Sequence, residues 1–110
     1  MLWFLRGIRR GVVTTRYPRA RDSWAEQLPT PPAFRVDLLT PELAARLADV
    51  CASGALRLQN GDLLLDLGSC TGCGDCVAVG GEAVVPSGEF ELASRDRAAL
   101  VKRIPIGERR

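Results

Sequence analysis

Histidine is absent from this chain of 110 residues. Histidine is the side chain whose ordinary pKa lies nearest to neutral pH, so its absence excludes catalysis by an imidazole general base. It also excludes metal sites that combine histidine with cysteine or carboxylate ligands. A metal site in this protein would therefore rest on other ligands, and the four cysteines are the first candidates.

The sequence also lacks a large excess of charge of either sign. Fifteen basic residues, of which only Lys102 is a lysine, stand against thirteen acidic ones, and the formal net charge is +2. So small an excess does not indicate binding to nucleic acid. The apolar fraction of 46% argues against disorder over most of the length. A chain of this size is expected to form one small domain whose modest core gains from a covalent or metal staple.

Long hydrophobic runs are missing. The apolar runs are four or five residues at most, against about 20 residues for a membrane-spanning helix. The first residues, MLWFLRGIRRGVVTTRYP, have arginines among the apolar residues, and neither a secretory signal nor a twin-arginine signal has that pattern. We therefore expect that the chain has no transmembrane segment of its own and that the protein is cytoplasmic. In that compartment cysteines are expected to bind metal rather than to form disulfides.

Residues 62–76, DLLLDLGSCTGCGDC, allow two incompatible interpretations. The part up to Gly72 is similar to the glycine loop after the first strand of an S-adenosylmethionine-dependent methyltransferase. A doubly wound fold needs several βαβ units of about 30 residues each after that loop. The residues after Gly68 have no second parallel-strand pattern and no room for those units, so we reject this interpretation.

The second interpretation starts from three cysteines at a spacing of three: Cys70, Cys73 and Cys76. This is the beginning of the run C-x2-C-x2-C-x3-C-P of bacterial ferredoxins, whose fourth cysteine ligates the other cluster in two-cluster members. Here Gly80-Gly81 stands in place of the fourth cysteine and the proline. The missing ligand must then come from the other half of the fold, where Cys51 is the one cysteine left.

Counting back from Cys51 by the same spacing leads to Leu47, Ala44 and Pro41, which are not cluster ligands. One motif thus keeps its first three ligands, and the other keeps only its fourth. By the crosswise rule the ligands of one cluster are complete and those of the other are all missing. We predict one [4Fe-4S] cluster, bound by Cys51, Cys70, Cys73 and Cys76.

Three alternatives remain open for these cysteines. A structural zinc site with four thiolates usually takes two separated C-x2-C pairs, which this spacing does not supply. The cysteines could instead be paired in disulfides or buried as inert core residues, although such close spacing is rare for core filling. A cluster-free, vestigial subunit is the third alternative.

Local patterns predict the elements of the N-terminal half. Residues 1–17 have the pattern of an amphipathic helix, and the proline-rich residues 18–33 are expected to run extended. A short strand is predicted over residues 34–38. Thr40 and Pro41 then indicate the N-cap and first position of a helix that ends near Cys51.

The C-terminal half is predicted in the same way. Asn60-Gly61 indicates a tight hairpin within residues 55–67, and the cysteine loop leads into a short helix through residues 77–79. A strand, a turn and a second strand are expected over residues 82–93. Ser94 is expected to cap a last helix that runs through Leu100.

The element order and the cysteine motif resemble a two-cluster ferredoxin, and the flanks LRGIRRGVVTTRYP and FELASRDRAALV resemble a particular family. It comprises the ferredoxin-like iron–sulfur subunits of formate hydrogenlyase, of membrane-bound [NiFe]-hydrogenases and of respiratory complex I. The resemblance implies an α+β, bacterial two-cluster ferredoxin-like fold, pseudo-symmetric, with short hairpins, two short helices, an N-terminal arm and a C-terminal helix. Its parts would be a partner-docking amphipathic segment and proline-rich arm (1–33), the [4Fe-4S] domain (34–92), and a C-terminal helix and tail (93–110).

The same resemblance implies a function. The chain would be a one-cluster electron-transfer subunit, not catalytic alone, in a multisubunit hydrogenase-like or complex-I-like oxidoreductase. Its partners would be the hydrogenase-like small and large subunits and membrane subunits, which would hold it on the cytoplasmic face of the membrane. The alternative is a scaffold or assembly subunit in which the cluster, or a zinc ion, is purely structural.

Overall fold

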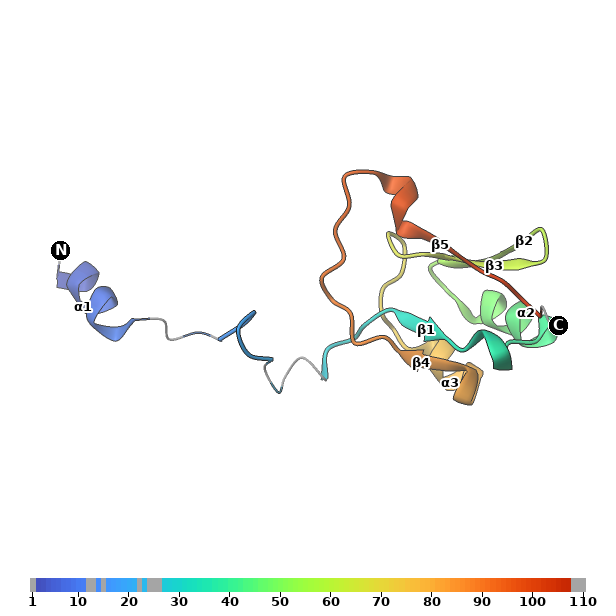
Figure 1. The fold of residues 1–110 in the computed structure, drawn as a ribbon, viewed down its shortest axis with the longest axis horizontal. Coiled ribbons are helices and arrows are strands. Elements are labelled where there is room, and N and C mark those ends of the chain that lie inside the picture. Colours follow the sequence, from blue (N-terminus) through green and yellow to red (C-terminus); the bar gives the residue numbers. More distant parts are fainter. Residues whose placement is uncertain (1, 12–13, 15, 22, 24–26, 108–110) are drawn as a thin grey trace.

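Two small antiparallel sheets and three α-helices make up the regular structure of the part of the chain that the computed structural model describes (Figure 1). That part comprises residues 2–11, 14, 16–21, 23 and 27–107. The predicted α+β class is confirmed.

The larger sheet has the strand order β2-β3-β5, in which β2 (Leu56–Gln59) and β3 (Asp62–Asp66) form the predicted hairpin. The turn residues Asn60 and Gly61 have φ angles of 52° and 81°. Both angles lie in the left-handed region that this kind of two-residue turn requires. Leu63 and Leu65 alternate along β3 and are buried, so one face of the hairpin belongs to the core.

The helix predicted from Ser94 to Leu100 is wrong, and with it the C-terminal helix. The side chain of Asp96 accepts a hydrogen bond from the Ala98 amide and caps a short 3₁₀ helix, η4 (Arg97–Leu100). The strand β5 (Val101–Ile104) follows and pairs antiparallel with β3. The free edge of β3 offers these residues a ladder of backbone hydrogen bonds, and this tertiary partner overrides the local helix signal.

The smaller sheet pairs β1 (Pro32–Phe34) with β4 (Val84–Pro86). The strand predicted over residues 34–38 is therefore wrong after Phe34, because the 3₁₀ helix η2 (Val36–Leu38) follows. The second strand expected at residues 89–93 does not form, and these residues have no regular structure.

Both predicted cluster-domain helices are present. The helix α2 (Pro41–Val50) begins as expected, with the Thr40 hydroxyl accepting a hydrogen bond from the Leu43 amide at 3.2 Å. The helix α3 (Asp75–Gly80) follows the cysteine loop and continues into the 3₁₀ helix η3 (Gly81–Ala83).

These elements form two matching halves, β1–α2–β2 and β3–α3–β4. The outer strands pair with each other, the inner strands pair with each other, and α2 packs against α3. Between them lies one core of nine buried residues: Leu39, Ala44, Leu47, Ala55, Leu56, Leu63, Leu65, Ala83 and Val84.

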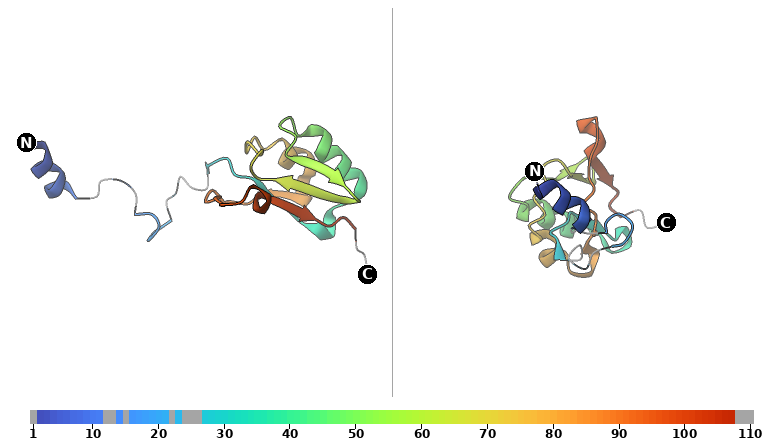
Figure 2. Two further views of the ribbon diagram at one scale, coloured as in Figure 1. Left: turned by 90° about the horizontal axis from the view of Figure 1, so that it is seen from above. Right: turned by 90° about the vertical axis from the view of Figure 1, so that its left-hand side faces the viewer.

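The N-terminal helix α1 (Leu2–Arg10) stands apart from this body, as Figures 1 and 2 show. It lies within the amphipathic helix predicted over residues 1–17 but ends at Arg10, before Gly11, whose φ of 65° is a common helix stop. The helix prediction is wrong at the described residues 11, 14, 16 and 17, and residues 1, 12, 13 and 15 lie outside the described part. The radius of gyration is 18.9 Å, against about 13 Å for a compact chain of this length. None of the helices in the described ranges has the length and apolar character needed to cross a membrane.

Candidate functional site

All four predicted ligands line one hollow in the body of the protein. The hollow lies between the end of α2, which supplies Cys51, and the start of α3 with the loop before it. That loop supplies Cys70 and Cys73, and the first turn of α3 supplies Cys76. The four cysteines are unpaired, Cys73 is exposed and the other three are half-buried. Residues distant in the sequence are thus brought to one place by the ends of two packed helices.

The backbone fixes where the cysteine loop starts. The Cys70 amide donates a hydrogen bond to the Asp66 carbonyl at 3.0 Å, and the Ser69 amide donates to the same oxygen at 3.1 Å. Further along, Gly72 has a φ of 70° and lies against Pro29, where an added Cβ would come 3.3 Å from the Pro29 carbonyl carbon. The loop is therefore held at its start by β3 and covered in its middle by the proline-rich segment.

Cys51 sits where α2 ends, in an extended conformation. Burial opposes ionisation of its thiol, but hydrogen bonds from the Ser53 side chain and from the amides of Leu56, Ala55 and Ser53 outweigh it and lower the pKa of Cys51. The Cys51 sulfur lies 3.5 Å from the Ser53 hydroxyl. The environment of this sulfur therefore favours the thiolate, which is the form that binds metal.

The opposite applies to Cys76. Burial raises the pKa of its thiol, and negative charge on Cys70 and Cys73 raises it further, although the Val77 amide acts in the other direction. The sulfurs of Cys70 and Cys73 are therefore close enough for negative charge on them to oppose ionisation of Cys76. A cation placed among the three sulfurs would offset that repulsion and favour the thiolate of Cys76.

The thiols do not converge on a single point. Among the residues that the structure describes, no three or more cysteine, aspartate or glutamate side chains are grouped to hold one metal ion. A tetrahedral zinc site with Zn–S bonds of ~2.3 Å would bring its sulfurs to about 3.8 Å from one another. The hollow itself is narrow, with a cavity volume of about 20 Å³.

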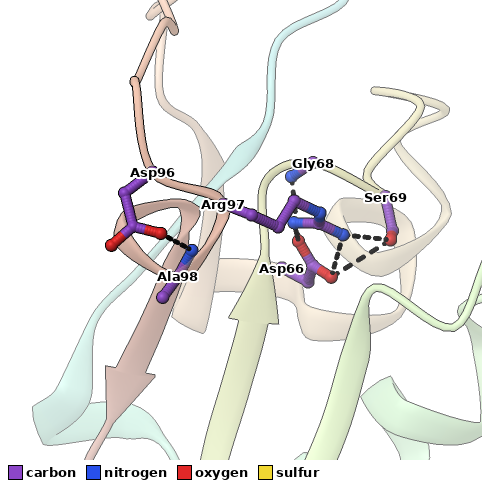
Figure 3. A network of polar contacts seen from close by, with 6 residues as sticks. All are labelled: Asp66, Gly68, Ser69, Asp96, Arg97 and Ala98. Carbon is purple, nitrogen blue, oxygen red and sulfur yellow. Dashed lines mark hydrogen bonds and ion pairs between the residues drawn. The ribbon is translucent and has the colours of Figure 1, made fainter.

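An ion pair that the sequence did not reveal braces the loop (Figure 3). Arg97 donates two hydrogen bonds to the buried carboxylate of Asp66, at 2.6 and 2.8 Å, and the Gly68 amide and the Ser69 hydroxyl donate to it at 3.0 and 3.1 Å. The Arg97 guanidinium holds the pKa of Asp66 well below its usual range. A Cβ on Gly68 would lie 2.7 Å from the Arg97 Cζ, so glycine is required for this approach.

The proline-rich segment supplies part of the site that sequence analysis missed. Thr30 and Pro32 line the hollow beside the cysteines. Thr30 is buried, and its hydroxyl accepts a hydrogen bond from the Gly88 amide at 3.2 Å. A cluster of prolines predicts an extended path but not the surface that the path covers, so the sequence contained no signal for this contact.

The corresponding place in the other half is filled. Helix α2 starts at Pro41, as expected, and the positions that would carry the other cluster's ligands include the buried Ala44 and Leu47. A Cβ on Gly80 would lie 2.6 Å from the Val84 Cβ and 3.6 Å from the Leu47 Cδ2. Leu47 thus packs beside Gly80, and Leu43, half-buried, packs against the same core.

Comparison of the sequence with protein-family models gives no match, and comparison with curated proteins gives none either.

Proposed function

We propose that the chain is an electron-transfer subunit that carries one [4Fe-4S] cluster on Cys51, Cys70, Cys73 and Cys76. The observation that carries the proposal is that all four cysteines line a single hollow, three of them from the segment that ends in the first turn of α3 and one from the end of α2 in the other half. A cubane cluster is held by four cysteine thiolates and moves single electrons. The protein's part is to place the sulfurs, exclude water and position the cluster near a partner.

The arrangement of the elements supports a ferredoxin-like assignment. Two strand–helix–strand halves share one core, with the outer strands paired and the helices packed side by side. In a pseudo-symmetric two-cluster ferredoxin each cluster takes three ligands from one half and the fourth from the other. The positions of Cys51 and of the loop cysteines correspond to that crosswise pattern.

The spacing of the cysteines along the sequence favours a cluster over a zinc ion. A structural zinc site with four thiolates usually takes two separated C-x2-C pairs. This chain has Cys70, Cys73 and Cys76 at a spacing of three and Cys51 alone, which is closer to the ferredoxin arrangement. Because the hollow is narrow, a bound cluster requires its wall to move outward, and Cys73 is the exposed one of the four cysteines.

The filled second half supports a stoichiometry of one cluster. Gly80 has no side chain, and the space that a cysteine would need there is occupied by Val84 and Leu47. This subunit would therefore carry one redox centre of the electron-transfer chain. Partner subunits of a hydrogenase-like or complex-I-like oxidoreductase would bring electrons to it and take them away, on the cytoplasmic side of a membrane.

The test is metal and sulfide analysis of the full chain purified without oxygen, with electron paramagnetic resonance after reduction. We expect about four irons and four sulfides per chain and the signal of one reduced cubane. Cys51→Ser should lose most of both, whereas Thr71→Ser, a change of one methyl group at the same loop, should retain them. Full iron content in Cys51→Ser would contradict the proposed ligand set. Zinc without iron in the unchanged protein would mean that the subunit is a structural scaffold rather than an electron carrier.

Electron transfer itself is tested in the assembled complex. We expect the cluster to titrate reversibly with redox potential and to be reduced when the complex turns over. A cluster that stays in one oxidation state during turnover would be structural.

A further inference from the structure

The helix α1 exposes more apolar surface than its own turns can cover. Leu2, Trp3, Phe4, Leu5 and Ile8 are 78%, 76%, 58%, 63% and 65% exposed. No residue of α1 is buried. An isolated helix of nine residues is marginal in water, because helix nucleation is costly and few hydrogen bonds follow it. A surface that covers the apolar side chains would supply the missing stabilisation.

The side chains of α1 after its first residue are sorted by face, and Leu2 lies on the side of the arginines. At 100° per residue, Trp3, Phe4, Leu5 and Ile8 lie on one broad arc, whereas Arg6, Arg9 and Arg10 lie together on the opposite side. The rings of Trp3 and Phe4 contact edge to face, with centroids 6.1 Å apart. The helix therefore presents a wide aromatic and aliphatic face and a narrow cationic one.

Charge is distributed unevenly along the chain. Residues 1–21 contain six arginines and no acidic residue. Residues 22–110 contain the remaining nine basic residues against all thirteen acidic ones. The small net charge of the whole chain thus conceals a cationic N-terminal segment attached to an acidic body, and the segment is complementary to a negatively charged surface.

We propose that α1 binds the surface of an anionic lipid membrane. A helix with arginines on one face and tryptophan, phenylalanine and leucine on the other lies in the plane of the headgroups, with its apolar face among the acyl chains. Trp3, Phe4 and Ile8 would enter the acyl boundary, and Arg6, Arg9 and Arg10 would reach the lipid phosphates. A fluid lipid surface accepts side chains of any shape, which suits a two-turn helix with four large and different apolar residues.

This inference does not depend on the iron–sulfur cluster. The residues between Gly11 and β1 would connect the membrane-bound helix to the body of the protein. A protein partner with an acidic, apolar groove is the competing occupant, and the following experiment separates the two.

The experiment uses the full chain and lipid vesicles. Trp24→Phe leaves Trp3 as the single tryptophan, so its fluorescence reports on α1 alone. With vesicles of phosphatidylglycerol and phosphatidylcholine we expect the protein to sediment with the lipid, the Trp3 emission to shift to the blue, and both effects to weaken with added salt. Vesicles of phosphatidylcholine alone should bind far less.

Matched variants identify the groups responsible. The triple change Arg6→Gln, Arg9→Gln and Arg10→Gln should weaken vesicle binding on the order of a hundredfold, because each arginine at an anionic surface contributes about fivefold. The control makes the same change of charge at three exposed arginines of the body, Arg46, Arg57 and Arg95, and should bind almost as the unchanged protein does. Trp3→Ser with Ile8→Ser should also lose binding.

Three results would overturn the proposal. They are a full chain that neither sediments with anionic vesicles nor shifts its Trp3 emission, equal binding to neutral vesicles, and equal losses in the two arginine triples. The first of these results would assign the face to a protein partner. Every variant site in α1 lies outside the core, so loss of binding cannot be traced to unfolding of the body.

Discussion

Leu47 and Gly80 meet across the two halves of the protein, 3.6 Å apart when measured from the Leu47 Cδ2 to the place of a Cβ on Gly80. The two positions are those that would share the second cluster in a two-cluster ferredoxin. Leu47 is fully buried there. A leucine and a glycine thus form core packing where the ferredoxin pattern has two sulfur ligands.

Substitution of Gly80 should therefore destabilise the protein. In Gly80→Ala the new methyl group would overlap Val84, and overpacking of a tight core costs about 1–3 kcal/mol. Unfolding by urea measures this loss. Gly7→Ala is the control, because a Cβ there meets nothing within 4 Å, and its stability should be unchanged. A Gly80→Ala protein as stable as the original would mean that α3 and β4 are not packed as closely as described.

The Asp66–Arg97 pair should make stability depend on pH in acid. The pKa of Asp66 lies below its ordinary value of 3.8 in the folded protein, chiefly because Arg97 donates hydrogen bonds to it. At low pH the unfolded chain then binds a proton that the folded chain does not. The contribution of Asp66 is fully present above pH 3.8 and is lost as the pH falls towards the lowered value.

Arg97→Gln should remove most of this acid dependence and should also lower stability at neutral pH, since a buried carboxylate is left without its cation. Urea unfolding measured at neutral pH and at a series of acidic pH values gives both the stability and its acid dependence. Arg35→Gln is the matched control, because its ion pair with Asp37 has both side chains largely exposed. Identical pH profiles for the two variants would contradict a role for Arg97.

Two truncated proteins should show that α1 is not needed for iron binding whereas the segment beside the cysteines is. Removal of residues 1–27 takes away α1 but leaves Thr30 and Pro32 in the wall of the hollow, so iron binding should persist. Removal of residues 1–33 also takes away Thr30 and most of β1, so iron content and thermal stability should both fall. Equal iron content in the two truncated proteins would show that the segment over the cysteine loop is dispensable.

Local chemistry made several features predictable from the sequence. The start of α2 follows from Thr40 and Pro41, and the hairpin follows from Asn60 and Gly61, because cap and turn conformations depend on a few neighbouring residues. The gathering of Cys51 with the loop cysteines was predictable for a different reason. A spacing rule that derives from cluster geometry links positions in the two halves.

Features that depend on distant partners were not predictable in this way. Residues 101–104 form a strand because β3 has an open edge beside them, and nothing within their own sequence specifies that edge. Arg97 pairs with an aspartate 31 positions earlier, a distance at which side-chain periodicity has no meaning. Thr30 is part of the site because the chain folds back over the hollow.

The pairing of β3 with β5 has a consequence for the order in which the protein can mature. During synthesis the chain leaves the ribosome from its N-terminus, so all four cysteines emerge before Arg97 and β5 do. Until then β3 keeps an unpaired edge, and Asp66 has no counter-ion. A nascent chain that has not yet reached Arg97 would display every thiol on an unbraced loop with an open strand edge, a surface prone to association with other strands. Residues made after all four cysteines, Arg97 and β5, are thus the ones that hold the start of the cysteine loop in place.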